Sequence, residues 1–259
     1  MATVYETNTF NSFLKDILHP GGLELTRRVA EIARIDENSQ VLDIACGKGE
    51  GCLLIAEEYD CRVTGIDISS KSVALAQSRA TAKGLDHRVR FIVSDAENLP
   101  FIDATFDAVV SECSFSILPD KVRAASEINR VLKSNGRLVI TDIILKKRVL
   151  DKIQVGLTPD PRLPLLPCIA GARSLEDYVM ILEQTGFINP YIEDHAKALK
   201  KLAYEIAVTF GGWEEFLQQL SLELSSEPCS KDFASSVEAY RQPFAQGEMG
   251  YALIRVTKP

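Results

Sequence analysis

The chain has 259 residues, of which 46% are hydrophobic and 25% charged, so it can bury a globular core and is not disordered along its whole length. Its formal net charge is −7, and no cluster of lysine and arginine is interleaved with aromatic residues, so a nucleic-acid partner is not expected. No membrane-length apolar run or signal peptide is evident, and the six cysteines are scattered, so we expect a cytoplasmic protein with reduced thiols and no membrane partner.

Residues 1–34 are predicted to form an N-terminal helical arm. Apolar residues recur through the first nineteen positions, which indicates an amphipathic helix that either packs as an arm or covers a ligand. The segment His19–Gly22 then breaks the chain and starts a second helix, predicted over 23–33. His19 is therefore interpreted either as a turn residue or as a contact to a substrate.

The segment Val41–Gly49 has the pattern of a buried parallel strand that runs into a glycine turn. Gly47 and Gly49 would let the backbone approach a ligand where a Cβ atom would collide. The helix predicted over 50–59 would point its unpaired N–H groups at the same ligand. The segment therefore predicts a nucleotide site.

Acidic residues at the ends of predicted strands favour one nucleotide over another. A dinucleotide fold would have a third glycine where this chain has Cys52, so an NAD site is not favoured. Asp43, in the first strand, would repel a pyrophosphate but attract an amino group such as that of S-adenosylmethionine. Asp67 ends the second strand, where a carboxylate suits a ribose diol. Asp95 follows the third strand, where an acceptor would meet the adenine amino group.

Five segments, in this order along the chain, resemble the class I S-adenosylmethionine-dependent methyltransferases. They are Val41–Gly49, Gly65–Ser69, Ser94–Phe101, Phe106–Val110 and Arg130–Leu138. The resemblance covers residues 40–143 and implies an α/β fold, with a doubly wound, mostly parallel, seven-stranded Rossmann-like sheet and a helical insertion before the last strand. It also implies methyl transfer from S-adenosylmethionine, with S-adenosylhomocysteine as the product. Ala45 departs from the family's usual glycine, which narrows the pocket slightly without removing a hydrogen-bond donor.

The resemblance also implies a set of cofactor contacts in this sequence. They are Asp43, Ala45, Cys46, Gly47, Gly49, Asp67, Ile68, Asp95, Ala96 and Glu112. Such contacts imply cofactor binding but not turnover, so a cofactor-binding subunit without catalytic activity stays an alternative.

The whole chain is predicted to be one domain, with the cofactor-binding core over 35–145 and a substrate-side half over 146–259. Further helices are predicted over 71–83, 120–133 and 174–185, and further strands over 89–93, 106–110, 137–144, 188–193 and 250–256. In the helix over 120–133, the residues expected to face the sheet are Val122, Ala125, Ile128 and Leu132, and Asn135-Gly136 is expected to end that helix. Prolines between 159 and 167 indicate a loop, and helices over 196–245 are expected to pack as core or to act as a lid over the methyl acceptor.

The methyl acceptor is predicted to be a small molecule, and two chemical classes remain open. The segment Ser111–Lys121 and the surroundings of Cys168 resemble arsenite methyltransferases, which implies a metalloid acceptor held by Cys168, with Cys113 and Cys229 as further candidates. The interpretation that we prefer is an organic acceptor with structural cysteines. The catalytic candidates are Glu112 and Cys168, no resident metal is expected, and the protein is expected to be a monomer or a homodimer.

Overall fold

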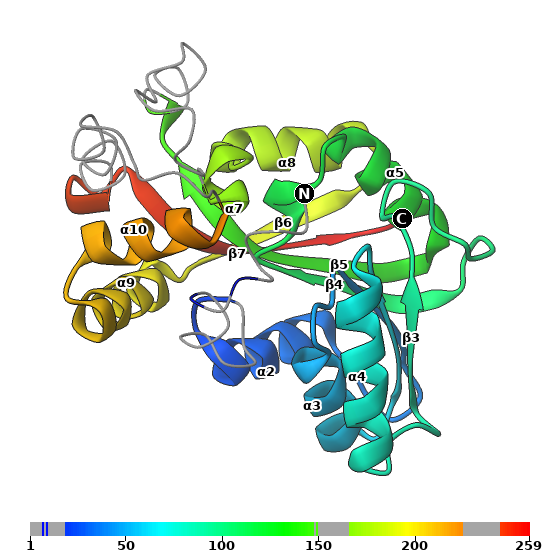
Figure 1. Ribbon diagram of the computed structural model, residues 1–259. Helices are drawn as coiled ribbons and strands as arrows, with labels where there is room; N and C mark the ends of the chain where they lie inside the picture. Colours follow the sequence, from blue (N-terminus) through cyan, green and yellow to red (C-terminus); the bar gives the residue numbers. More distant parts are fainter. Residues whose placement is uncertain (1–6, 8, 10–18, 148, 150–165, 225–243) are drawn as a thin grey trace.

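The computed structural model describes residues 7, 9, 19–147, 149, 166–224 and 244–259. Its centre is a seven-stranded sheet with the strand order β3-β2-β1-β4-β5-β7-β6 (Figure 1). The strands are β1 (Gln40–Ile44), β2 (Arg62–Asp67), β3 (Val89–Val93), β4 (Phe106–Glu112), β5 (Leu132–Leu145), β6 (Ile188–Asp194) and β7 (Met249–Thr257). Strands β1 to β5 run parallel, and β7 lies antiparallel between β5 and β6. The predicted doubly wound, mostly parallel sheet is confirmed.

Helices cover both faces of the sheet, as Figure 1 shows. They are α2 (Gly22–Ala33), α3 (Glu50–Tyr59), α4 (Ser70–Ala82), α5 (Lys121–Val131), the short α7 (Pro167–Ala170), α8 (Leu175–Gln184), α9 (Ala196–Phe210) and α10 (Trp213–Leu224), with a 3₁₀ turn η1 at Phe115–Ile117. One buried cluster joins the sheet to α2, α3, α4, α7, α9 and α10, and a second joins it to α5 and α8. In β1, Val41 belongs to the first cluster and Leu42 to the second, because successive side chains of a strand point to opposite faces.

The sheet-facing side of α5 differs from the prediction at two positions. Val122 is 47% exposed, whereas Ala124, Ala125 and Ile128 are fully buried. Each residue turns a helix by about 100°, so a stripe at 121, 124, 125 and 128 leaves Val122 off the sheet. Leu132, expected on the same helical face, is the first residue of β5.

The Asn135-Gly136 turn was predicted to lie between α5 and the next strand, and this is wrong. Helix α5 already ends at Val131, and β5 runs on from Leu132 through the glycine. The register against β4 shifts along this stretch, from Phe106 opposite Leu132 to Ala108 opposite Arg137. Asn135 has a φ of 64°, so the two residues form an irregularity inside the strand rather than a helix end.

The helical insertion before the last strand is represented by α9 and α10, which pack against each other. Their buried apolar side chains are Leu199, Ala203, Ile206, Phe216, Leu217 and Leu220. Of the helix predicted over residues 1–19, only Thr7, Thr9 and His19 are among the described residues. The prolines at 159, 161 and 164 and Cys229 lie outside them.

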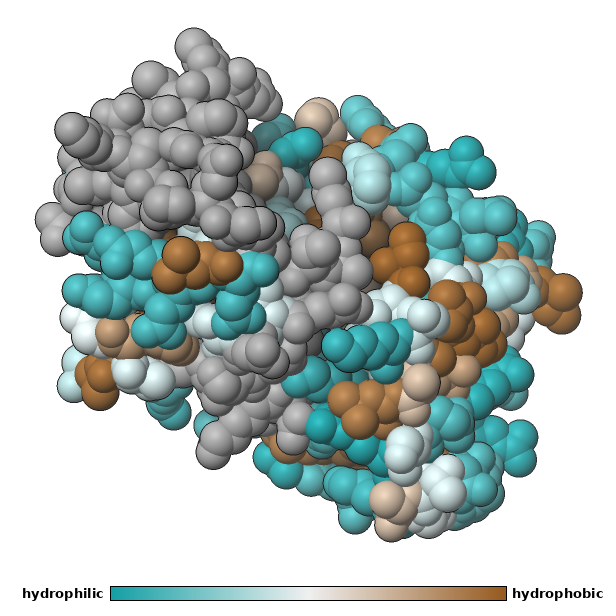
Figure 2. Space-filling view, viewed as in Figure 1, coloured by the Kyte–Doolittle hydropathy of each residue, from teal (hydrophilic) through white to brown (hydrophobic). Residues whose placement is uncertain are grey.

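The surface of the described part is mixed in character. The face in Figure 2 carries hydrophilic residues interrupted by separate hydrophobic patches. Scattered apolar side chains such as Ile102 and Tyr204 are exposed at 81% and 71%, which is ordinary for a globular protein. Among the described helices none combines the length and the apolar character that crossing a membrane requires.

Candidate functional site

The glycine turn after β1 folds as a series of left-handed residues at the carboxyl edge of the sheet. Ala45, Gly47 and Gly49 have φ angles of 56°, 53° and 83°. Gly49 is required by packing, because a Cβ atom there would lie 2.6 Å from the Phe91 ring and 2.9 Å from Ala76 Cβ. The glycine that the sequence analysis assigned to ligand approach therefore also lets the start of α3 lie against β3 and α4.

Two predicted cofactor residues, Asp43 and Glu112, come together at this edge because β1 and β4 are neighbouring parallel strands. Both side chains are buried. Thr26 Oγ1, from α2, donates a hydrogen bond to Glu112 Oε2 at 3.0 Å, and the Nε2 atom of His19 lies 3.7 Å from the same oxygen. The Cys52 thiol donates to Asp43 Oδ2 at 3.0 Å.

Burial controls the protonation of this pair. It raises the pKa of Asp43 to about 7, with the neighbouring charges of Glu112 and Asp67 adding to the increase and the Cys52 hydrogen bond opposing it. Burial also raises the pKa of Glu112, against the opposing effects of His19 and Thr26. Among the described residues neither carboxylate has a lysine or arginine partner. A cationic ligand bound beside these two buried carboxyl groups would stabilise their ionised forms.

Gly51, in the first turn of α3, borders the space between these carboxylates. A Cβ atom at this position would lie 3.4 Å from Glu112 Oε2 and 3.7 Å from both Asp43 Oδ2 and Thr26 Cγ2. Sequence reasoning missed both Gly51 and Thr26. A glycine inside a predicted helix was the available signal for the first. For Thr26 the sequence held none, since its partner is 86 residues away.

The other predicted cofactor residues follow the same edge along β2 and β3. Asp67 accepts hydrogen bonds from the N–H of Gly47 at 2.9 Å and of Ser69 at 2.8 Å, which ties the glycine turn to the end of β2. Ile68 is 73% exposed. Asp95 is exposed and accepts the N–H of Glu97, whereas Ala96 is buried.

The candidate cysteines separate into two places. Cys46 lies in the glycine turn, and its Sγ would lie 2.8 Å from a Cβ atom at Gly65. Cys113, with a φ of 53°, precedes η1, and the thiol of Cys168 from α7 lies against it. This neighbouring thiol and burial together raise the pKa of Cys113 well above its usual value, so the group stays a protonated thiol.

Comparison with known proteins identifies the family. Residues 35–186 match a family model described as a methyltransferase domain. The chain is 30% identical, over 91% of its length and 83% of the relative, to 27-O-demethylrifamycin SV methyltransferase of Amycolatopsis mediterranei. It is 31% identical, over 67% of its length and 75% of the relative, to the O-methyltransferase rstn1 of Aspergillus nomiae.

Solved structures share the same fold. The cyclase SpnF aligns over 91% of this chain and 81% of its own, with 28% identity and a TM-score of 0.69. Phosphoethanolamine N-methyltransferase 2 of Haemonchus contortus, solved with S-adenosylmethionine, aligns over 97% of this chain and 56% of its own, with 22% identity and a TM-score of 0.72. The chain belongs to the S-adenosylmethionine-dependent methyltransferases, and its cofactor is S-adenosylmethionine.

Proposed function

We propose that this enzyme methylates a hydroxyl group of a small organic molecule, and that Asp43 and Glu112 hold the ammonium group of the cofactor. The observation that carries the proposal is the pair of buried carboxylates facing one glycine, with no lysine or arginine beside them among the described residues. An ammonium group between them would supply the missing positive charge. Gly51 leaves the room that the group needs, since any side chain there would enter this space.

The same edge of the sheet offers partners for the rest of the cofactor. We assign Asp67, whose carboxylate accepts the backbone N–H groups of Gly47 and Ser69 at the end of β2, to the ribose diol, because carboxylate oxygens accept hydrogen bonds from hydroxyl groups. We assign the exposed Ile68 to one face of the adenine, and the region of Asp95 and Ala96 to its amino edge. His19 is assigned to positioning: its side chain is only 10% exposed and already contacts Glu112 and Thr26.

The acceptor is proposed to lie beside Cys113, over the carboxyl ends of β4 and β5. The cofactor supplies an electrophilic methyl group on a sulfonium, and the protein's task is to align the acceptor and exclude water. We assign the exclusion of water to α7, α9 and α10, which pack in one buried cluster with Cys168. The choice of a hydroxyl acceptor is supported by O-methyltransferases among the relatives, including the two named above.

A metalloid acceptor is not favoured. Trivalent arsenic binds thiolates, whereas burial and the neighbouring Cys168 keep Cys113 protonated. The third candidate, Cys229, lies outside the described residues.

Calorimetric titration tests the ammonium site with two matched ligands. S-adenosylhomocysteine carries the ammonium group, and 5′-methylthioadenosine has the same thioether nucleoside without it. We expect Asp43→Asn and Glu112→Gln each to weaken S-adenosylhomocysteine roughly tenfold to a hundredfold, the effect of losing a hydrogen bond to a charged group. The affinity of both variants for methylthioadenosine should stay within about twofold of that of the unchanged protein. Asp103→Asn, whose side chain is 77% exposed, is the control and should change neither. Equal losses for both ligands would contradict the assignment.

A radiolabelled methyl screen tests the activity and the acceptor class. We expect label from S-adenosylmethionine to enter phenols or alcohols in preference to amines, thiols and arsenite. Transfer to arsenite that Cys168→Ser abolishes would replace the hydroxyl proposal with the metalloid one. Tight cofactor binding with no transfer to any acceptor class would support a binding subunit instead.

A further inference from the structure

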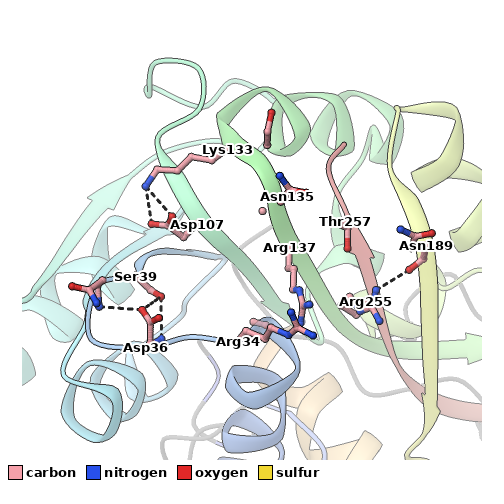
Figure 3. Close-up of a pocket in the computed structure, with 14 residues that line it drawn as sticks. Arg34, Asp36, Ser39, Asp107, Lys133, Asn135, Arg137, Asn189, Arg255 and Thr257 are labelled. Carbon is pink, nitrogen blue, oxygen red and sulfur yellow. Dashed lines mark hydrogen bonds and ion pairs between the residues drawn. The ribbon is translucent and has the colours of Figure 1, made fainter.

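A cavity of about 620 Å³ lies at the edge of the sheet where the parallel strands begin (Figure 3). The candidate cofactor residues lie at the opposite edge. Its walls come from the amino ends of β4, β5 and β6, the end of the antiparallel β7, and the loop after α2. The methyl-transfer site lies at the carboxyl ends of the parallel strands, so this cavity is a separate site.

Three arginines from different parts of the chain line this cavity. Arg34 is the C-cap of α2, Arg137 belongs to β5, and Arg255 belongs to β7. Arg137 pairs with Thr257 and Val139 pairs with Arg255, so Arg137 and Arg255 are diagonal neighbours on one face of the sheet. Figure 3 shows the three guanidinium groups lying next to one another on one side of the cavity.

The guanidinium groups have few partners and no acidic one among the described residues. Arg137 Nη1 donates to the carbonyl of Ile32 at 2.8 Å, and Arg255 Nη1 donates to the carbonyl of Asn189 at 2.9 Å. The Nε–H of Arg255 is buried and has no hydrogen-bond partner. Burial lowers the pKa of Arg137, and the charges of Arg34 and Arg255 lower it further, which is the effect of like charges held together.

The two acids of the cavity do not neutralise these arginines. Lys133 Nζ binds both carboxylate oxygens of Asp107, at 2.9 and 2.8 Å. Asp36 accepts hydrogen bonds from the Ser39 hydroxyl at 2.8 Å and from the N–H of Asn38 at 3.0 Å. With Lys133 and Asp107 paired, the cavity keeps an excess of positive charge in a chain whose net charge is −7.

We propose that this cavity binds the phosphate group of a small phosphorylated molecule. Planar guanidinium groups form paired hydrogen bonds to phosphate oxygens, and Arg34, Arg137 and Arg255 bring three such groups to one cavity. The bond from Arg137 to Ile32 also stabilises the C-terminal end of α2, but it uses only one of five N–H donors. The volume leaves room for an organic part beyond the phosphate itself.

Calorimetry on the full chain saturated with S-adenosylhomocysteine tests the site, with inorganic phosphate and glycerol 3-phosphate as probes. We expect both to bind, and glycerol 3-phosphate to bind more tightly. The double variant Arg34→Gln/Arg255→Gln should weaken both by about tenfold or more, because charge-assisted hydrogen bonds are lost. If the double variant does not fold, the single variant Arg34→Gln replaces it, because Arg34 is exposed. We expect this single variant to weaken phosphate binding too, by a smaller factor.

The control variant is Lys201→Gln on α9, which removes the same charge from a side chain that is 76% exposed. It should bind phosphate as the unchanged protein does. Unaltered affinity for S-adenosylhomocysteine in every variant would show that the fold and the distant cofactor site are intact. Equal phosphate affinity in the double variant and the control, or no binding of either probe at millimolar concentration, would overturn the proposal.

Discussion

Replacing Gly51 with alanine should make the ligand-free protein more stable and its cofactor binding weaker. Without ligand, the new methyl group meets nothing closer than 3.4 Å, which is an ordinary contact. Alanine is preferred over glycine inside a helix by roughly 0.5–1 kcal/mol. For a chain of this size that gain raises the melting temperature by roughly 1–4 °C.

With ligand, the same methyl group enters the space between Glu112 and Asp43. An ammonium group displaced from one carboxylate loses a charged hydrogen bond, which is about 1.5–3 kcal/mol, or roughly tenfold to a hundredfold in affinity. Differential scanning calorimetry measures the first effect, and titration with S-adenosylhomocysteine measures the second. Methylthioadenosine, which has no ammonium group, should bind with little change. A Gly51→Ala protein that binds S-adenosylhomocysteine normally would refute the proposed position of the ammonium group.

Three further predictions concern strain, protonation and packing. Ala45→Gly should raise the free energy of unfolding in urea by about 1 kcal/mol or less, because a left-handed φ of 56° strains alanine and not glycine; a loss of stability would contradict this. Asp43 has a pKa of about 7 in the folded chain, against a usual value of 3.8 in the unfolded chain. The folded chain therefore binds this proton more tightly, and the stabilisation from protonated Asp43 is lost as the pH rises from about 4 to about 7. Urea titrations across this range should show a shallower fall in Asp43→Asn, and an unchanged slope would remove the assignment. Ile128→Ala should lower the free energy of unfolding by about 2–5 kcal/mol, whereas Val122→Ala, at an exposed position, should lower it by less than about 1 kcal/mol. Similar values for the two variants in urea titrations would be inconsistent with the orientation of α5.

The sequence predicted the strand, the glycine turn and the helix at the carboxyl edge of the sheet. A strand, a glycine turn and a helix follow one another in Val41–Tyr59, and this local pattern has few structural solutions. Asp43 and Asp67 were predicted at strand ends, and the parallel pairing of β1 with β2 brings them to one edge. Val122 was wrongly predicted to face the sheet. The spacing of apolar residues shows that a helix has a buried face, but it does not show which residues lie at the centre of that face.

The sequence by itself determined the fold class and the place of the glycine turn at the end of the first strand, since strand and helix periodicity and glycine conformation are properties of neighbouring residues. Only the tertiary structure decided which side chains act together. It brought Thr26 to Glu112 across 86 positions of sequence, and it gathered Arg34, Arg137 and Arg255 around one cavity. These groups affect one another through burial and charge only when they lie within a few ångströms in space. Their separation along the sequence does not show whether they do.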